Sequence, residues 1–382
     1  MSQKPSHRGA IPPFQVMEVM RAAEARAAAG SEVFHLEVGQ PSTGAPRGVI
    51  EAAGTAMAND VLGYTLALGV EELRDAISRH YSHMYGIDIP AARIVITTGA
   101  SGAFMLAFLA AFDAGDRVAL ALPGYPGYRH ILTALGNRVV AIPTGAASRY
   151  QPSVALLEQL DEPVNGLIVA SPSNPAGTMI PEDEFAELAD YCERRDIRLV
   201  SDEIYHGITY SGKAATAAAF SDQAIVINSF SKYFSMTGWR LGWMVVPEEL
   251  LRSVESLAQN LFISPPTLSQ RAAIAAFDCH EELQANIDRY AANRALLLEE
   301  LPKAGFESLA PADGAFYIYA DVSQMTNDSQ DFCRQMLDET GVAATSGVDF
   351  DPLRGNAFVR FSFSGSTEDM AEAAKRLQNW QR

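Results

Sequence analysis

Residues 166–201 read GLIVA-SPSNPAGTMI-PEDEFAELADYCER-RDI-RLVS. The two outer segments, Gly166–Ala170 and Arg198–Ser201, are short apolar runs of the kind found in strands that are covered on both faces. Between them lies the amphipathic stretch Pro181–Arg194, which we expect to be a helix. A strand, a helix and a second strand in this order predict one unit of a parallel sheet.

The same alternation extends in both directions from this unit. The expected strands are 93–97, 117–122, 138–142, 166–170, 198–201, 224–228 and 241–246, and the expected helices between them are 70–86, 101–112, 128–135, 153–160 and 181–194. These elements predict an α/β fold with a parallel sheet between two layers of helices.

From about residue 281 the pattern changes. A long charged helix (281–301) leads to a strand (315–320), a helix (330–340), a strand (358–363) and a last helix (368–380). We expect this α+β unit to form a second domain that the long helix joins to the first. The N-terminal segment, with one helix among several prolines, is compatible with packing on either unit.

Composition and charge exclude several classes of protein. The 382 residues include 29 Lys+Arg and 46 Asp+Glu, a formal charge of −17, which argues against nucleic acid or an anionic membrane as the main partner. Cys192, Cys279 and Cys333 form no Cys-x-x-Cys pair, so we expect neither disulfides nor a metal site. The charged N-terminus lacks a signal peptide's apolar region, and the longest apolar run, 103–112, is far shorter than the roughly 20 residues of a membrane span. We expect a cytoplasmic protein.

A lysine follows one of the expected strands in the stretch NSFSKYFSMTGWRLG, residues 228–242. Lys232 lies there among small and aromatic residues with no acidic residue nearby, and desolvation of this kind makes an amine a nucleophile for imine formation. Ser229, Ser231 and Arg240 add hydroxyls and a fixed cation, which match a phosphate. The alternative is a surface loop with a solvated lysine, and the flanking serines and arginine favour a functional site.

Polar residues also follow two neighbouring strands, at the edge where parallel sheets bind ligands. Asp202 comes directly after the expected strand 198–201. An isolated carboxylate there needs a cationic partner, such as a protonated pyridine nitrogen. The alternatives are that Asp202 caps a helix or forms a surface ion pair. Tyr205 is placed to donate a hydrogen bond to a phenolate oxygen. Asn174, in a turn fixed by Pro and Gly, offers a donor and an acceptor, although an ordinary turn asparagine fits equally well.

Two further strand ends carry ligand-binding signals. Residues 94–102 (IVITTGASG) run into an apolar helix whose first N–H groups can bind an anion. A dehydrogenase nucleotide loop and a nucleophile elbow both fail here, because Ala103 replaces a required glycine. Tyr125, in PGYPGY (123–128), can serve as a flat platform for a planar ligand or simply pack.

Taken together, these residues resemble the fold-type I pyridoxal-phosphate-dependent aminotransferases of class I/II, the aspartate aminotransferase-like family. The resemblance covers nearly the whole chain, and the family's lysine signature is matched position by position from Ser229 to Gly242. It implies a ping-pong transfer of an amino group from an L-amino acid to a 2-oxo acid. It also implies a three-layer αβα large domain with a mostly parallel sheet (46–285) and a small α+β domain (1–45 with 286–382).

The resemblance assigns a role to each cofactor-binding residue. Lys232 would hold pyridoxal 5'-phosphate as a Schiff base and shuttle a proton between the substrate Cα and the cofactor C4′. Asp202 would keep the pyridine nitrogen protonated, so that the ring acts as an electron sink. Tyr205 and Asn174 would hydrogen-bond the ring hydroxyl oxygen, and Tyr125 would stack on the ring. The residues assigned to the phosphate and its surroundings are Ala100, Ser101, Ser229, Ser231 and Arg240.

The resemblance also implies shared sites and a substrate clamp. Tyr64 would reach the neighbouring subunit's phosphate, which implies a homodimer. Arg360 would clamp the substrate α-carboxylate, with Gly39 and Asn174 beside it. If Arg360 rides on the small domain, carboxylate binding would close the two domains and expel water.

One position departs from the family pattern. Some bacterial aspartate aminotransferases of this subgroup carry a lysine for the distal carboxylate where this chain has Ser101. Phe14 and Tyr128 are candidates for an apolar or aromatic side-chain pocket instead.

Two other functions are compatible with parts of this pattern. A β-eliminating carbon–sulfur lyase of the same fold would use the same lysine, aspartate and arginine, although the ending Gly238–Gly242 favours aminotransferases. A non-catalytic regulator would need an appended DNA-binding region, and the N-terminus is too short and insufficiently basic for one.

Overall fold

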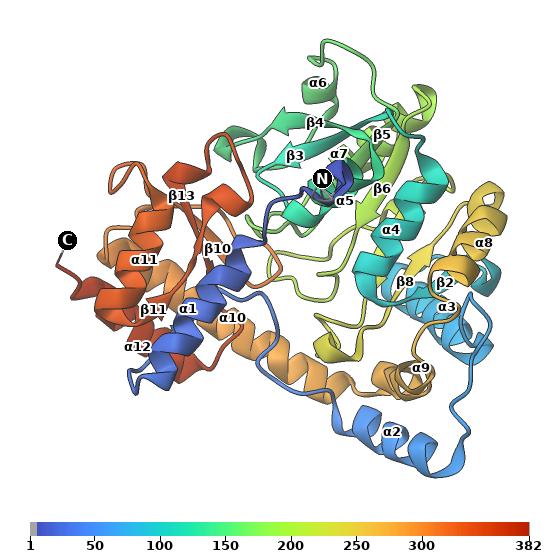
Figure 1. The fold of residues 1–382 in the computed structure, drawn as a ribbon, viewed down its shortest axis with the longest axis horizontal. Helices are drawn as coiled ribbons and strands as arrows, with labels where there is room; N and C mark the ends of the chain where they lie inside the picture. The colour runs from blue at the N-terminus through green and yellow to red at the C-terminus, as the bar shows by residue number, and fades with distance from the viewer. Residues whose placement is uncertain (1–5, 382) are drawn as a thin grey trace, which may run out of the picture.

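The computed structural model describes residues 6–381 and is organised around a seven-stranded sheet (Figure 1). The strands lie in the order β2 (Ile94–Thr97), β8 (Gly242–Val245), β7 (Ile225–Ser229), β6 (Arg198–Asp202), β5 (Gly166–Ala170), β3 (Arg117–Leu122) and β4 (Arg138–Pro143). β8 is antiparallel to both of its neighbours, and the other neighbouring pairs are parallel. The predicted mostly parallel sheet is therefore confirmed, and all seven predicted apolar runs are strands of it.

Helices cover both faces of this sheet. Successive strand residues point to opposite faces, so Trp243 of β8 packs into one apolar cluster and Met244 into another. The first cluster includes side chains of α3 (Glu71–Tyr85) and α7 (Glu182–Arg194), and the second includes those of α4 (Gly99–Ala111) and α5 (Pro126–Leu135). Burial on both faces explains why the strands are apolar along their whole length.

One predicted helix is wrong in its extent. Of residues 153–160 only α6 (Val154–Leu157) is helical, after the Ser153 side chain accepts a hydrogen bond from the Leu156 N–H. The chain then turns towards Pro163, and a residue that precedes proline disfavours the α conformation.

A smaller antiparallel sheet forms the second unit. Its order is β12 (Thr345–Ser346), β13 (Phe358–Ser362), β10 (Tyr317–Asp321) and β9 (Ser308–Leu309), and the accompanying helices are α10 (His280–Lys303), α11 (Ser329–Thr340) and α12 (Thr367–Gln378). In Figure 1, α10 runs from beneath the large sheet to this unit.

The N-terminal segment packs on the second unit. β1 (Phe34–His35) pairs in parallel with β11 (Val342–Ala343), and Phe34 and Leu36 belong to the apolar cluster of that unit. α1 (Gln15–Ala28) lies across the same side, as Figure 1 shows.

Among the α-helices of residues 6–381, three have no counterpart in the predicted pattern: α2 (Arg47–Asn59), α8 (Leu251–Leu261) and α9 (Thr267–Ala273). Over residues 6–381 no helix combines the length and the apolar character that crossing a membrane requires.

Candidate active site

A cavity of about 410 Å³ lies at the carboxyl ends of the parallel strands, where the large sheet faces the second unit. Eleven of the thirteen predicted site residues line it: Gly39, Ala100, Ser101, Tyr125, Asn174, Asp202, Tyr205, Ser231, Lys232, Arg240 and Arg360. The other two, Ser229 and Tyr64, are not among its lining residues. Segments up to 321 residues apart in the sequence therefore meet in one place.

Lys232 lies three residues beyond the end of β7 and lines the cavity. The Nζ donates a hydrogen bond to the Gly39 carbonyl oxygen at 2.6 Å. Burial, with a further contribution from the positive charges of Arg360 and Arg240, lowers the pKa of the amine to about 8, against a smaller opposite effect of Asp202. The predicted desolvated lysine is therefore present, with a substantial neutral fraction near pH 7 to 8.

Asp202 is the last residue of β6, and its carboxylate is buried. It accepts hydrogen bonds from the Ile204 N–H at 3.1 Å and from the Tyr128 hydroxyl. Burial raises the pKa of this carboxyl to about 6, although both hydrogen bonds and the charge of Lys232 favour the ionised form. A buried carboxylate of this kind is suited to pair with a cationic ring nitrogen.

The hydroxyl of Tyr128 has a role that sequence reasoning missed. We expected Tyr128 to form an aromatic pocket wall with Phe14, and both side chains do line the cavity. The Tyr128 hydroxyl, however, is directed at Asp202. The available signal was its spacing, because a residue three positions after Tyr125 in a helix faces the same side.

Tyr125 precedes the first turn of α5 and forms one wall of the cavity. Its ring makes edge contacts with Phe14 (centroids 5.8 Å apart) and Tyr128 (5.2 Å). A Cβ atom at Gly127 would lie 2.3 Å from the Tyr125 ring, so the turn needs glycine there to hold the ring in this position. The ring is thus a fixed flat surface beside Asp202.

The N-terminus of α4 and Arg240 form a cradle for an anion. Gly99 has a left-handed φ of +67°, and a Cβ atom there would lie 2.6 Å from Arg240 Nη2. The guanidinium is therefore packed against the helix start, next to Ala100 and Ser101. The first N–H groups of a helix lack intrahelical partners, and the helix dipole favours negative charge there.

Ser231 and Ser229 take different places in this cradle. Ser231 lines the cavity, whereas the Ser229 hydroxyl, which has one proton to donate, lies within hydrogen-bond distance of two acceptors, Ser231 Oγ at 2.9 Å and the Leu241 carbonyl oxygen at 3.0 Å. The Ser231 N–H in turn donates to Ser229 Oγ at 3.1 Å. Ser229 therefore fixes the lysine turn from behind the cavity.

Arg360 projects from β13 on the opposite wall. Its Nη1 donates to Asn174 Oδ1 at 2.9 Å, and its Nη2 donates to the Glu37 carbonyl oxygen at 2.6 Å. The guanidinium lies between the rings of Tyr317 (4.3 Å) and Phe350 (4.7 Å). Its Nε is buried without a hydrogen-bond partner within residues 6–381. A fixed, buried cation with a free donor is suited to a carboxylate.

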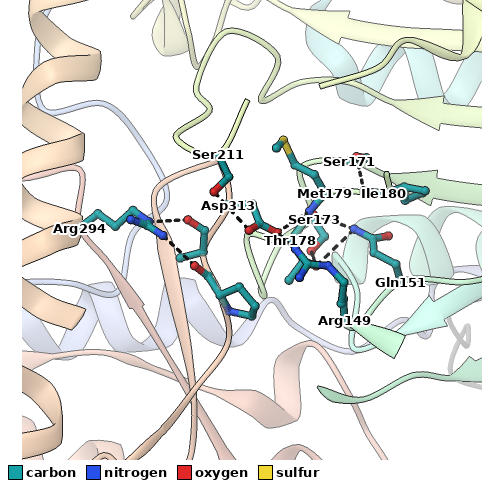
Figure 2. Close-up of polar contacts among 12 residues, drawn as sticks. Arg149, Gln151, Ser171, Ser173, Thr178, Met179, Ile180, Ser211, Arg294 and Asp313 are labelled. Carbon is teal, nitrogen blue, oxygen red and sulfur yellow. Dashed lines mark hydrogen bonds and ion pairs between the residues drawn. The ribbon is translucent and has the colours of Figure 1, made fainter. Parts of the chain in front are cut away.

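The loop that carries Asn174 is held by a dense set of polar contacts (Figure 2). The Ile180 N–H donates to Ser171 Oγ at 3.0 Å, and closes the loop on itself. Asp313, in the segment before β10, accepts from the Met179 N–H at 3.2 Å and pairs with Arg149. These contacts fix Asn174 relative to the sheet that carries Arg360.

Gly39 is required by a close approach. A Cβ atom there would lie 1.8 Å from Tyr317 Oη, which itself shares a 2.7 Å hydrogen bond with Tyr205 Oη. Tyr317 was not predicted as a site residue. Tyr317 stands in a strand with other aromatic residues, and this sequence pattern predicts only that it packs in the core.

Tyr64 lies apart from the cavity. It follows α2, and 83% of its side chain is exposed. Its predicted contact is with a neighbouring subunit and stays a prediction.

The lining residues fit pyridoxal phosphate. The anion cradle at Gly99 matches the phosphate, and the flat Tyr125 ring matches the face of the cofactor ring. The buried Asp202 carboxylate matches the ring nitrogen, and the Lys232 amine matches the aldehyde. The role predicted for Arg360, binding the substrate carboxylate, stays a prediction.

Proteins named as aminotransferases are similar to this chain over nearly its whole length. A valine–pyruvate aminotransferase of Mycobacterium tuberculosis is 51% identical over 384 residues, covering 100% of this chain and 99% of the relative. A crystal structure of an aminotransferase from the same organism has a TM-score of 0.98 at 51% identity and covers 99% of both chains. Aspartate aminotransferase of Thermus thermophilus with maleate has a TM-score of 0.93 at 28% identity, covering 99% of this chain and 100% of that one.

A sequence profile of the family described as "Aminotransferase class I and II" matches residues 31–377. This match spans the lysine signature, the strand ends and the arginine of the second unit. The family's enzymes act on amino acids and 2-oxo acids. The chain belongs to the class I and II aminotransferases and is a pyridoxal-phosphate-dependent aminotransferase.

Proposed function

We propose that this aminotransferase moves the amino group of a small apolar L-amino acid, of the valine type, to pyruvate. The observation that carries the proposal is the character of the cavity wall away from the cofactor cradle. That wall is built from apolar side chains: Phe14, Val16, Met17, Met20, Val38 and Phe104. Within the described part of the chain, the cations that line the cavity are Lys232, Arg240 and Arg360, and each already has a role.

A second carboxylate on the substrate would have no partner in this cavity. Ser101, which stands where some relatives carry a lysine, lines the cavity with a neutral hydroxyl. Burying an unpaired carboxylate against methionine and phenylalanine side chains is costly, whereas an isopropyl group gains from the same contact. The name of the Mycobacterium tuberculosis relative supports the same donor and acceptor.

We assign the chemical steps to side chains as follows. Arg360 binds and orients the substrate α-carboxylate through its free Nε and one Nη, with Asn174 beside it. The Lys232 amine takes the proton from the substrate Cα and returns it in the reverse direction, as its lowered pKa favours. When bound, the cofactor supplies an electron sink for the charge left on Cα. The apolar wall and α1 exclude water from that atom.

The ping-pong order follows from a single substrate site. One carboxylate clamp and one amine serve the amino acid first and the 2-oxo acid second. A carbon–sulfur lyase would release pyruvate from an S-conjugated amino acid without a 2-oxo acid acceptor, and we expect no such release here.

The proposal is tested by stopped-flow half-reactions with single amino acids. We expect L-valine and L-alanine to convert the cofactor to its amine form at least tenfold more efficiently than L-aspartate. The reason is that the unpaired distal carboxylate of L-aspartate, like a methylene-sized mismatch in an apolar pocket, costs about 1–3 kcal/mol. Pyruvate should then restore the starting spectrum. An enzyme that prefers aspartate or 2-oxoglutarate would refute the substrate assignment and leave the family assignment intact.

We also infer a homodimer with shared sites. Near Tyr64 in the sequence, α2 and the segment that follows it carry further large exposed apolar side chains: Ile50, Met57, Val61 and Leu66. Exposed apolar groups in such number are typical of an interface. Sedimentation should give twice the 41.2 kDa chain mass. Tyr64→Phe should weaken cofactor binding without changing that mass, and a monomeric active enzyme would contradict the inference.

We infer that residues 46–285 form one domain and residues 1–45 with 286–382 a second. Lys232 then belongs to the first and Arg360 to the second, so a substrate carboxylate bridges the two. Comparing the interdomain angle with and without a substrate analogue tests this, and an unchanged angle would count against it. The three free cysteines support a reducing, cytoplasmic environment, and secretion of the active enzyme would contradict it.

A further inference from the structure

Beneath the active site lies a buried polar cluster around Glu203, the residue that follows Asp202. The Glu203 side chain is fully buried. Its Oε1 accepts three hydrogen bonds, from Ser201 Oγ (3.0 Å), Thr216 Oγ1 (3.1 Å) and the Ala217 N–H (2.8 Å). Its Oε2 is buried without a hydrogen-bond partner in residues 6–381.

His206 connects this cluster to the loop that carries Asn174. Its Nε2 lies 2.9 Å from the Ser171 carbonyl oxygen, which only accepts, so Nε2 carries the proton. Nδ1 then accepts from the Tyr85 hydroxyl at 2.6 Å and lies 3.5 Å from Glu203 Oε2. The cluster therefore ties the end of β6, which bears Asp202 and Tyr205, to the end of β5.

The groups that face Glu203 are neutral near pH 7, apart from Asp202. Burial lowers the pKa of His206 to about 3 and that of His80, on α3 behind it, to about 4. Burial also raises the pKa values of Tyr81 and Tyr85 above the ordinary tyrosine value. No lysine or arginine within the described chain forms an ion pair with Glu203. An ionised Glu203 would therefore be a second anion beside Asp202 with no cation to balance it.

We propose that Glu203 is a positioning residue that works as a neutral carboxylic acid, holding Asp202, Tyr205 and Asn174 against the cofactor ring, and that its ionisation sets the alkaline limit of activity. The proposal rests on the places proposed for those three residues. Burial raises the pKa of the Glu203 carboxyl to about 8, although the three hydrogen bonds to Oε1 favour the ionised form, and the charge of Asp202 adds a smaller effect in the same direction as burial. Loss of its proton to solvent would repel Asp202 and open the turn between them.

A stability measurement on cofactor-free protein tests the protonation state. The pKa of Glu203 rises from an ordinary 4.5 to about 8 in the folded chain. Between these values the folded state holds a proton that the unfolded state has released, so stability falls as pH rises through this window and levels off above it. Glu203→Gln cannot titrate. Its Tm relative to wild type should therefore increase from pH 5 to pH 9, whereas the exposed α7 control Glu187→Gln should show no such trend.

A second measurement tests the positioning role on the enzyme with cofactor bound. Glu203→Ala should lose roughly 10- to 100-fold in kcat, because small misplacements of reacting groups cost that much. It should also change the visible circular dichroism of the bound cofactor. Glu203→Gln, which can still accept the three hydrogen bonds, should restore both and extend activity above pH 8.

Two results would overturn the proposal. One is a Tm difference for Glu203→Gln that does not vary with pH, which would mean that Glu203 is ionised in the fold. The other is a Glu203→Gln enzyme that keeps the wild-type alkaline limb or is as impaired as Glu203→Ala. The stability test needs neither cofactor nor substrate, so its outcome is independent of the function proposed for Asp202.

Discussion

Replacing Arg360 with alanine removes the cation that we assign to the substrate α-carboxylate. In the free enzyme the guanidinium is already fixed by Asn174 Oδ1 and the Glu37 carbonyl and lies between two aromatic rings. Substrate binding therefore orders little that was mobile. The substrate carboxylate would instead become a buried anion without a partner.

The magnitude follows from that geometry. Truncating one partner of a buried, hydrogen-bonded charge pair costs about 2–5 kcal/mol, which corresponds to roughly a 30- to 5,000-fold loss of kcat/KM. The loss should appear with every α-amino acid. Arg360→Lys should be intermediate, because an ammonium keeps the charge and loses the two-pronged geometry of guanidinium.

The assay compares L-valine with 2-methylpropan-1-amine, which is the same molecule without its carboxylate. Wild type should strongly prefer L-valine, and Arg360→Ala should bring the two rates close together by losing activity on L-valine alone. Arg334→Ala, an exposed arginine on α11 paired with Asp331, serves as the matched control and should change neither rate. If Arg360→Ala lowered both rates by the same factor, the arginine would be structural and the clamp assignment would be refuted.

Three further substitutions test other parts of the site. Lys232→Ala should abolish turnover and leave some non-covalent cofactor binding. Borohydride should no longer fix the cofactor to the chain, and a near wild-type rate would refute the assignment of Lys232 as the Schiff-base lysine. Ser101→Lys should raise activity on L-aspartate at least tenfold by supplying about 1.5–3 kcal/mol to its distal carboxylate, and an unchanged valine-to-aspartate ratio would show that the distal group lies elsewhere. Tyr128→Phe removes a hydrogen bond that lowers the pKa of Asp202, so this pKa should rise above about 6. Because less of Asp202 is then ionised at a given acidic pH, the acidic limit of cofactor affinity should move to higher pH, and titration of binding from pH 5 to pH 8 would detect it.

The strand ends are the part of the site that the sequence predicted best. Asp202 ends one buried strand, Asn174 and Lys232 lie shortly beyond two others, and parallel strands bring their carboxyl ends to one edge. The identity of each residue, together with its strand, was enough to expect a shared cavity.

Residues whose function depends on orientation were not predictable in the same way. Tyr128 and Tyr317 stand in aromatic runs that look like core, and their hydroxyls meet Asp202 and Tyr205 only after the chain has folded. Ser229 stands inside the lysine signature, yet its hydroxyl lies behind the cavity wall.

The order of residues along the chain determined that the large unit is an α/β sheet, that its strand ends carry the chemistry, and that Lys232 is an unusual amine. These are local properties, because the periodicity of apolar residues, the turn residues and the apolar neighbours of Lys232 can each be recognised within a few positions of the sequence. The antiparallel insertion of β8 and the approach of Arg360 to Asn174, 186 residues away, were decided only by tertiary structure. So was the complete burial of Glu203. Burial and charge pairing depend on what packs around a group, and that information is spread over the whole chain.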